Sequence, residues 1–236
     1  MRLAVIPARG GSKRIPRKNI KPFAGKPMIA WTIGALQAAG CFDEIAVSTD
    51  DDEIAAVARD CGASVPFRRP AALADDHAGT IPVIGHAVEW YRAAGRAPGL
   101  VCCAYATAPF LRPADILRGY ELLAAAGDAL DYAFSVTSYG FPIQRALRLL
   151  GDGTVAMFAP EHFSTRSQDL EEAFHDAGQF YWGRAAAWAE GRVIFSPRAR
   201  PVVLPRHRVQ DIDTPDDWTR AELMFAALQA AGEGAS

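Results

Sequence analysis

One segment near the N-terminus combines positive charge with glycine in a way that suits phosphate binding. Residues 8–26 carry seven Lys or Arg side chains and three glycines, and they show no apolar periodicity. Structureless segments beyond about 15 residues are uncommon unless they serve a function. Gly10 and Gly11 permit positive φ angles and close backbone approach, so consecutive N–H groups could face a phosphate. Positive charge is supplied by Arg9, Lys13 and Lys18. This combination predicts a phosphate-binding loop.

The loop differs from the better-known nucleotide-binding loops. It contains neither GxxxxGK[ST] nor GxGxxG, which excludes the Walker and Rossmann dinucleotide motifs. A solvated basic surface segment is the simplest alternative, because charged runs are usually exposed. Nucleic-acid binding is disfavoured, since aromatic residues are not interleaved with the basic cluster and the chain balances 25 basic against 27 acidic residues, for a net charge of −2.

A second candidate site lies near the C-terminus, where Asp211 and Asp213 end a predicted strand. Two residues apart on a strand, both carboxylates would point to the same face and could share a hard cation such as Mg²⁺ on a triphosphate. The DxD pattern alone is weak evidence. In the alternative interpretation, Asp213 or Thr214 simply caps the helix that starts at Pro215.

The elements that must position these residues follow from apolar periodicity. The run 3–6 predicts a buried strand, and further strands are predicted at 44–48, 100–105, 132–136, 179–182 and 208–212. Helices are predicted at 27–40, 80–94 and 113–127, from 50–52 to 62, and from 215 onward. Strands alternating with helices predict an α/β three-layer sandwich with a mainly parallel, Rossmann-like sheet, in a single domain over 1–236. Ligands of such sheets bind at the carboxyl ends of the strands, where the basic loop leaves the first strand.

The rest of the composition narrows the possibilities. Half of the residues are hydrophobic, which suffices for a packed core. Neither a signal peptide nor an apolar run of about 18 residues is present, so we expect a cytoplasmic protein without a membrane partner. The four cysteines lack CxxC spacing and are expected to be reduced core residues: Cys41, Cys61, Cys102 and Cys103. Four dispersed histidines show no zinc-ligand spacing: His77, His86, His162 and His207.

The sequence IPARGGSKRIPRKN resembles the signature of the cytidylyltransferases that activate acidic sugars, such as N-acetylneuraminate cytidylyltransferase. The resemblance implies that this loop contacts the phosphates and ribose of CTP. The loop residues concerned are Ala8, Arg9, Gly10, Gly11, Ser12, Lys13, Lys18 and Asn19. Residues 69–80 resemble the family's RPxxLAxD segment, which holds cytosine and ribose and implicates Arg69, Ala78 and Thr80. VQDIDTPDDW resembles the DIDT segment, whose aspartates coordinate Mg²⁺ and correspond to Asp211 and Asp213.

On the acceptor side the sequence departs from the sialic-acid enzymes. Their LQPTSP is replaced by AYATAP at 104–109, with Tyr105 in place of the glutamine, and their FRPNG by FHDAG at 174–178, with His175 in place of the arginine. Together with FPIQRAL at 141–147 and RSQDL at 166–170, these changes resemble the pseudaminic acid branch over nearly the whole chain. The implied substrate contacts are Tyr105, Gln144, Arg166, His175 and Gln179. A packed histidine and a subunit interface around Gln144 are the alternatives.

Residues 139–175 break the strand–helix rhythm, and we expect them to leave the sheet. This excursion, within 139–176, resembles the family's dimerisation arm, which implies a homodimer and residues that complete the neighbouring active site.

The resemblance implies that an acidic nine-carbon sugar, pseudaminic acid, reacts with CTP to give CMP-pseudaminic acid and pyrophosphate. Catalysis is expected to rest on positioning and charge neutralisation by Arg9, Lys13, Lys18 and Asp211, with Mg²⁺ as cofactor. The group that accepts the sugar's proton stays open. The alternatives are the same reaction on N-acetylneuraminic, legionaminic or Kdo-type acids, and a non-enzymatic nucleotide-binding regulator on this fold.

Overall fold

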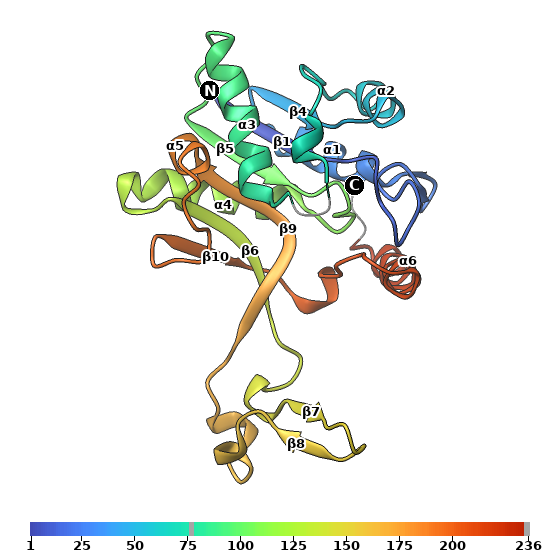
Figure 1. Ribbon diagram of the computed structural model, residues 1–236, viewed down its shortest axis with the longest axis vertical. Coiled ribbons are helices and arrows are strands. Elements are labelled where there is room, and N and C mark those ends of the chain that lie inside the picture. Colours follow the sequence, from blue (N-terminus) through green and yellow to red (C-terminus); the bar gives the residue numbers. More distant parts are fainter. Residues whose placement is uncertain (76–77, 234–236) are drawn as a thin grey trace.

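A six-stranded sheet forms the centre of the molecule in the computed structural model, which describes residues 1–75 and 78–233 (Figure 1). The strand order is β10 (Ala199–Val203), β6 (Tyr132–Ser138), β9 (Phe174–Arg184), β5 (Leu100–Ala104), β1 (Arg2–Pro7) and β4 (Glu44–Ser48). The pairs β1–β4, β1–β5 and β10–β6 are parallel, whereas β9 lies antiparallel between β5 and β6. The prediction of a mainly parallel sheet is confirmed.

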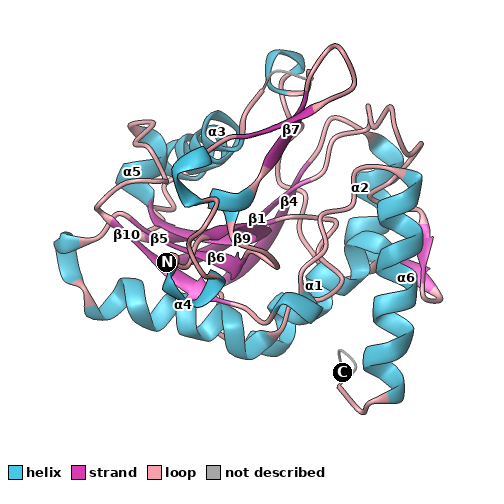
Figure 2. Cartoon of the chain, turned by 90° about the horizontal axis from the view of Figure 1, so that it is seen from below, coloured by secondary structure: helices cyan, strands magenta, loops and turns pink. Residues whose placement is uncertain are grey.

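Helices cover both faces of the sheet, so the molecule has the three predicted layers (Figure 2). One face is covered by α1 (Met28–Ala39), α2 (Asp52–Asp60) and α4 (Pro113–Ala125), and the other by α3 (Thr80–Ala93) and α5 (Ala185–Ala189). Within β1, Ala4 and Ile6 pack toward the first group of helices, whereas Leu3 and Val5 pack toward the second. Because side chains alternate along a strand, burial on both faces requires the continuous apolar run seen in the sequence.

A smaller apolar cluster joins the C-terminal helix to the basic loop. In it, α6 (Pro215–Ala230) contributes Trp218 and Phe225, which pack around Phe23 with ring centroids 5.4 Å away in both cases. Phe23 belongs to a short hairpin of β2 (Pro22–Phe23) and β3 (Lys26–Pro27), and Ile15 of the loop lies in the same cluster. This packing fixes the basic loop between β1 and α6.

The helix ends follow their local signals. Gly40 ends α1 in the left-handed conformation, with φ 63°, and the Asp51 side chain caps α2 by accepting from the Ile54 N–H. Thr214 caps α6 in a capping box with Asp217. The interpretation of Thr214 as a helix cap is therefore confirmed.

The predicted strand at 208–212 is wrong. The chain instead forms a short 3₁₀ turn at Arg206–Arg208 and then runs without strand pairing into the α6 cap. Two buried attachments explain the difference: the Arg208 side chain is held by an ion pair with Asp115, and its backbone carbonyl by the Gln179 amide. The edge strand lies earlier, at β10, where Pro201 obscured the pattern and is tolerated because edge strands need fewer donors. The short helix α5 was not predicted, and β9 is longer than the predicted strand at 179–182.

Between β6 and β9 the chain leaves the sheet and projects as a separate lobe, here called the arm, residues 139–173 (Figure 1). It contains a hairpin of β7 (Leu147–Leu149) and β8 (Val155–Met157), together with three 3₁₀ turns. The predicted excursion is confirmed as a structural feature.

Over residues 1–75 and 78–233, none of the helices is long and apolar enough to cross a membrane. All four cysteines are free thiols, and Cys41, Cys102 and Cys103 are buried as predicted, whereas Cys61 is half-buried. In the same described residues, no group of three or more His, Cys, Asp or Glu side chains comes together as a metal-binding cluster. Asp76 and His77, which belong to the predicted cytosine segment and to the dispersed histidines, lie outside the described residues.

Candidate active site

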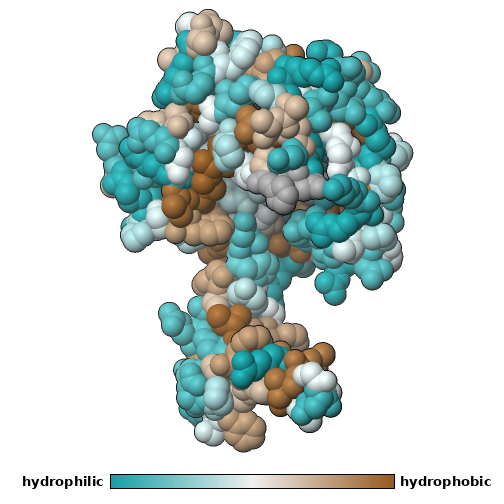
Figure 3. All heavy atoms as spheres, viewed as in Figure 1, coloured by the Kyte–Doolittle hydropathy of each residue, from teal (hydrophilic) through white to brown (hydrophobic). Residues whose placement is uncertain are grey.

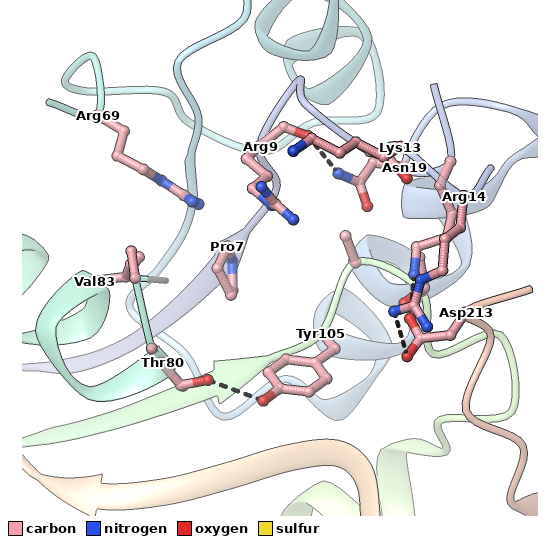
Figure 4. Close-up of a pocket in the computed structure, with 16 residues that line it drawn as sticks. Pro7, Arg9, Lys13, Arg14, Asn19, Arg69, Thr80, Val83, Tyr105 and Asp213 are labelled. Atoms are coloured by element: carbon pink, nitrogen blue, oxygen red, sulfur yellow. Dashed lines mark hydrogen bonds and ion pairs between the residues drawn. The ribbon is translucent and has the colours of Figure 1, made fainter. Parts of the chain in front are cut away.

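A cavity of about 520 Å³ opens at the carboxyl ends of β1 and β5, where the fold predicts a ligand site (Figure 4). It brings together residues that the sequence places far apart. The predicted site residues that line it are Arg9, Ser12, Lys13, Lys18, Asn19, Arg69, Ala78, Thr80, Tyr105 and Asp213. Figure 4 shows the loop cations on one side of the cavity and the Thr80–Tyr105 pair on the opposite side.

The lining is strongly cationic. Five basic side chains face the cavity, whereas among its described lining residues Asp213 is the single carboxylate. The basic set is Arg9, Lys13, Arg14, Lys18 and Arg69. Because a cleft focuses the field of its charges, this imbalance attracts a multiply charged anion such as a nucleoside triphosphate.

The loop is shaped by contacts to the end of β4 rather than by positive φ angles at its glycines. Neither Gly10 nor Gly11 adopts a positive φ, and the Gly10 N–H donates to Asp50 Oδ1 at 3.0 Å. A Cβ atom at Gly10 would lie 2.7 Å from Asp51 Oδ2, whereas one at Gly11 would meet nothing closer than 3.9 Å. Gly10 is thus needed for close approach to a carboxylate. Ala8, Gly10 and Gly11, which were predicted to bind the nucleotide, are not among the residues that line the cavity.

Two further contacts fix the loop. Arg17, at φ 56°, turns its guanidinium to Asp51 and Glu53, and this partner holds the pKa of Asp51 down at about 2. Asn19 is buried and donates from Nδ2 to the Arg9 carbonyl at 3.0 Å. Arg17 therefore stabilises the loop without lining the cavity. Asn19 fixes the position of the Arg9 backbone, and the Arg9 side chain lines the cavity.

Lys18 links the loop to the acidic segment before α6. Its ammonium donates to the Ile212 carbonyl and lies 3.0 Å from Asp213 Oδ1, and only 17% of its side chain is exposed. Arg14 reaches the other carboxylate oxygen, with Nη2 2.9 Å from Asp213 Oδ2. Arg14 is a cavity residue that was not predicted from the sequence, although it lies between Lys13 and Lys18 in the basic loop.

Asp211 and Asp213 do not share the face of a strand, because that strand is absent. Asp213 lines the cavity, whereas Asp211 lies on the exposed side of the same segment. The pKa of Asp211 is nevertheless raised, first by local desolvation of its carboxyl group and then by the negative charge of Asp213. Burial opposes the charged form of Asp213, but Lys18 and Arg14 outweigh it and lower the pKa of this carboxyl. Two neighbouring carboxylates suit a hard cation, which typically takes one or two protein carboxylates together with substrate phosphates and water.

Arg69 forms a rigid cationic wall. It is 5% exposed, and its guanidinium donates to the Ser48 hydroxyl at 3.1 Å and to the Ser48 carbonyl. Burial lowers the pKa of Arg69 to about 10, and the nearby positive charge of Arg9 acts in the same direction. The guanidinium stays charged at neutral pH, and an anion beside it would stabilise this buried positive charge.

Opposite the cations, the Thr80 and Tyr105 hydroxyls share a hydrogen bond of 2.9 Å. Tyr105 is held from behind, since the Thr32 hydroxyl donates to its carbonyl at 2.8 Å and its ring lies against Tyr181. Burial raises the pKa of Tyr105. A neutral phenol with a fixed position can donate to or accept from a sugar hydroxyl.

The other predicted acceptor residues do not reach this cavity within one chain. Gln144 and Arg166 lie on the arm, where they bind the Glu171 carbonyl and Asp169. His175 lies where the arm joins β9, with its ring against Tyr139. Gln179 is buried and does not line the cavity: its Nε2 donates to the Arg208 carbonyl at 2.6 Å, while its Oε1 is buried without a partner among the described residues.

Comparison with known proteins relates this chain to the cytidylyltransferases. A family model described as cytidylyltransferase matches residues 3–214. A pseudaminic acid cytidylyltransferase of Campylobacter jejuni is 44% identical over 94% of this chain and 95% of its own length. A CMP-N,N'-diacetyllegionaminic acid synthase of Legionella pneumophila is 34% identical over 97% of this chain and 98% of its own.

A solved structure of CMP:2-keto-3-deoxy-manno-octonic acid synthetase complexed with CTP shares the fold. Its TM-score is 0.69 at 17% sequence identity, over 96% of this chain and 98% of that one. Since the family model spans most of the chain and the Campylobacter protein matches it almost from end to end, the chain belongs to the cytidylyltransferase family.

Proposed function

We propose that this cytidylyltransferase joins CTP to pseudaminic acid and releases CMP-pseudaminic acid and pyrophosphate. The observation that carries the reaction type is the cationic cavity at the carboxyl end of β1, which matches the charge of a triphosphate. The acceptor follows from the 44% identity to a pseudaminic acid cytidylyltransferase. CTP is a cytoplasmic nucleotide, so we place the reaction in the cytoplasm.

In the reaction, the anomeric hydroxyl oxygen of the sugar attacks the α-phosphorus of CTP in line. The P–O bond to the β-phosphate breaks, pyrophosphate leaves, and the hydroxyl proton passes to a base or to water. Arg9, Lys13 and Lys18 surround the negative charge that develops on the phosphates. The Lys18 ammonium is already held by the Ile212 carbonyl and Asp213, so it needs little reorganisation in the chemical step.

The nucleoside end of CTP is assigned to the wall formed by Arg69, Ala78 and Thr80, which lies across the cavity from the acidic segment. Arg69 is anchored by Ser48 and offers its remaining guanidinium donors to acceptors on the base or ribose. Thr80 opens α3, so its hydroxyl and the adjacent backbone N–H groups are held at the cavity edge.

Asp211 and Asp213 are the residues that would hold Mg²⁺. When bound there, the ion supplies charge neutralisation on the phosphate oxygens. The negative charge of Asp213 beside Asp211, and the position of Asp213 on the cavity wall, support this assignment. An Asp211→Ala variant is expected to need a higher Mg²⁺ concentration for half-maximal pyrophosphate release, and an unchanged Mg²⁺ dependence would contradict the assignment.

The exposed surface of the arm supports the proposal that the protein forms a homodimer. In this dimer, the partner subunit would supply contacts to the sugar substrate. Its surface carries large exposed apolar side chains, among them Phe141 (87% exposed), Leu149 (83%) and Phe163 (79%), and Figure 3 shows hydrophobic spheres gathered on this lobe at the bottom of the view. Exposed apolar patches of this kind mark interaction sites. A second copy of the chain would cover them and bring its Gln144 and Arg166 toward a cavity that they do not reach in their own chain.

Oligomeric state tests this arrangement directly. Light scattering is expected to report a dimer, and a Phe141→Ser/Leu149→Ser variant is expected to shift it toward monomer with a matching loss of turnover. A wild-type protein that is monomeric at assay concentration would contradict it.

The acceptor is tested by a substrate panel with CTP and Mg²⁺. Pyrophosphate release is expected to be fastest with pseudaminic acid, compared with N-acetylneuraminic, legionaminic and Kdo-type acids. Preference for another acid would keep the cytidylyltransferase reaction but overturn the acceptor assignment. Absence of turnover with every acid, together with retained CTP binding, would favour a nucleotide-binding regulator instead.

A further inference from the structure

Both oxygens of the Asp213 carboxylate already carry a cationic partner. Lys18 Nζ lies 3.0 Å from Oδ1 and Arg14 Nη2 lies 2.9 Å from Oδ2, and Figure 4 shows Arg14 beside Asp213 at the cavity wall. A divalent cation that binds Asp213 must therefore compete with positive charges that are in place. Since like charges repel strongly at this range, one partner has to leave.

The two partners differ in how firmly they are held. The Lys18 side chain is 17% exposed, and its ammonium also donates to the Ile212 carbonyl. The Arg14 side chain is 63% exposed, so its pairing with Asp213 takes place largely in water, where ion pairs contribute little. Arg14 is the partner that can leave at low cost, while Lys18 stays to hold the acidic segment.

A released Arg14 remains in the right place to act on the substrate. It lines the same cavity as Arg9 and Lys13, to which a triphosphate would bring anionic oxygens. A planar guanidinium binds phosphate through two parallel hydrogen bonds, which a lysine ammonium cannot do. The same side chain can thus pair with a carboxylate in the free enzyme and with a phosphate in the complex.

We propose that Arg14 is an exchangeable counter-ion of Asp213, which yields the carboxylate to the divalent cation and moves to the phosphates of CTP. The proposal rests on the assignment of Asp213 as a metal-binding residue. It gives Arg14 two opposite effects: it weakens binding of the metal to the free enzyme, and it strengthens use of the nucleotide.

The test measures both effects in an Arg14→Ala variant. Mn²⁺ is titrated into the full-length protein without nucleotide, and free Mn²⁺ is followed by electron paramagnetic resonance. The variant is expected to bind Mn²⁺ about two- to fivefold more tightly than the wild type, as removal of one exposed competing ion pair predicts. Its kcat/KM for CTP is expected to fall at least about tenfold, the effect of losing a charge-assisted hydrogen bond.

Two further variants separate the possible failures. Arg17→Ala removes the same charge from the same loop, but Arg17 pairs with Asp51 and Glu53, so its Mn²⁺ binding is expected to match the wild type. Asp213→Asn is expected to lose the Mn²⁺ site. If Asp213→Asn binds Mn²⁺ as the wild type does, Asp213 is not a metal-binding residue. The proposed exchange of Arg14 between Asp213 and the phosphates is then refuted as well.

If Asp213→Asn loses Mn²⁺ while Arg14→Ala binds it no more tightly than the wild type, the exchange alone is overturned. Equal tightening in Arg14→Ala and Arg17→Ala would also overturn it, because the effect would then reflect net loop charge. Tighter Mn²⁺ binding with unchanged kcat/KM for CTP would refute the transfer of Arg14 to the phosphates.

Discussion

Loss of the buried ion pair between Arg208 and Asp115 is expected to destabilise the protein sharply. Arg208 Nη1 lies 2.6 Å from Asp115 Oδ2, and the two side chains are 8% and 4% exposed. The pair attaches the segment that leads to Asp211 and Asp213 to the first turn of α4. An Arg208→Met variant removes the charge while keeping most of the side-chain volume.

The magnitude follows from what the substitution leaves behind. Removing one partner of a buried pair typically costs about 3–5 kcal/mol, since the other charge stays buried and uncompensated. Asp115 would retain Arg118, but that guanidinium is 3.5 Å away and its side chain is half exposed, so it compensates only partly. We therefore expect a loss of about 3 kcal/mol, and for a chain of this size a Tm lower by about 6–12 °C.

Calorimetry and urea unfolding measure this loss, with two variants as references. Arg92→Met removes an exposed pair, Arg92 with Glu89, and is expected to cost less than about 1 kcal/mol. Asp115→Leu/Arg208→Met replaces both charges by apolar groups and is expected to recover most of the lost stability. An Arg208→Met protein within about 1 kcal/mol of the wild type, or a double variant less stable than the single one, would refute this reasoning.

Three further predictions concern the basic loop. Gly10→Ala is expected to destabilise the protein by about 1–3 kcal/mol and to impair CTP use, because its Cβ would lie 2.7 Å from Asp51 Oδ2. Gly11→Ala should be tolerated, and equal effects of the two variants in urea unfolding would contradict this prediction. Because Arg17 depresses the pKa of Asp51 from 3.8 to about 2, their pairing stabilises the fold fully above the unfolded value and is lost as pH falls through about 2. Arg17→Met should therefore flatten the acid limb of unfolding free energy against pH, and an unchanged limb would count against the pairing. Lys13→Ala is expected to lower kcat/KM for CTP by about 10²-fold in a pyrophosphate-release assay, and full activity would argue against a phosphate-binding role.

Much of the fold could be predicted because its signals are local. The apolar run of β1, Gly40 at the end of α1 and the cap at Thr214 each depend on a few neighbouring residues. The basic loop was likewise visible as charge and glycine without periodicity. Its position after the first strand followed from the rule that parallel sheets bind ligands at the carboxyl ends of their strands.

The errors arose where distant segments compete for the same residues. Residues 208–212 have a strand-like sequence but do not add an edge strand. Instead, the Arg208 side chain is buried in an ion pair with Asp115, and the Arg208 carbonyl accepts a hydrogen bond from the Gln179 amide. Gln179 is buried and does not line the cavity, which a sequence cannot show, and its role as a substrate contact stays a prediction. The antiparallel insertion of β9 is similarly a matter of pairing over a long separation.

The sequence by itself determined which chemical groups are available: a cationic loop after a buried strand and an acidic pair near the C-terminus. Both segments resemble motifs of one enzyme family. Only the tertiary structure decided how those groups meet. The Gly10 N–H donates to the Asp50 carboxylate, and Arg14 and Lys18 each pair with one oxygen of Asp213. The arm places Gln144 and Arg166 away from the cavity of their own chain. The physical reason is that residue type and spacing fix charge and local conformation, whereas the partner of each charge depends on which segments the packed core brings within a few ångströms.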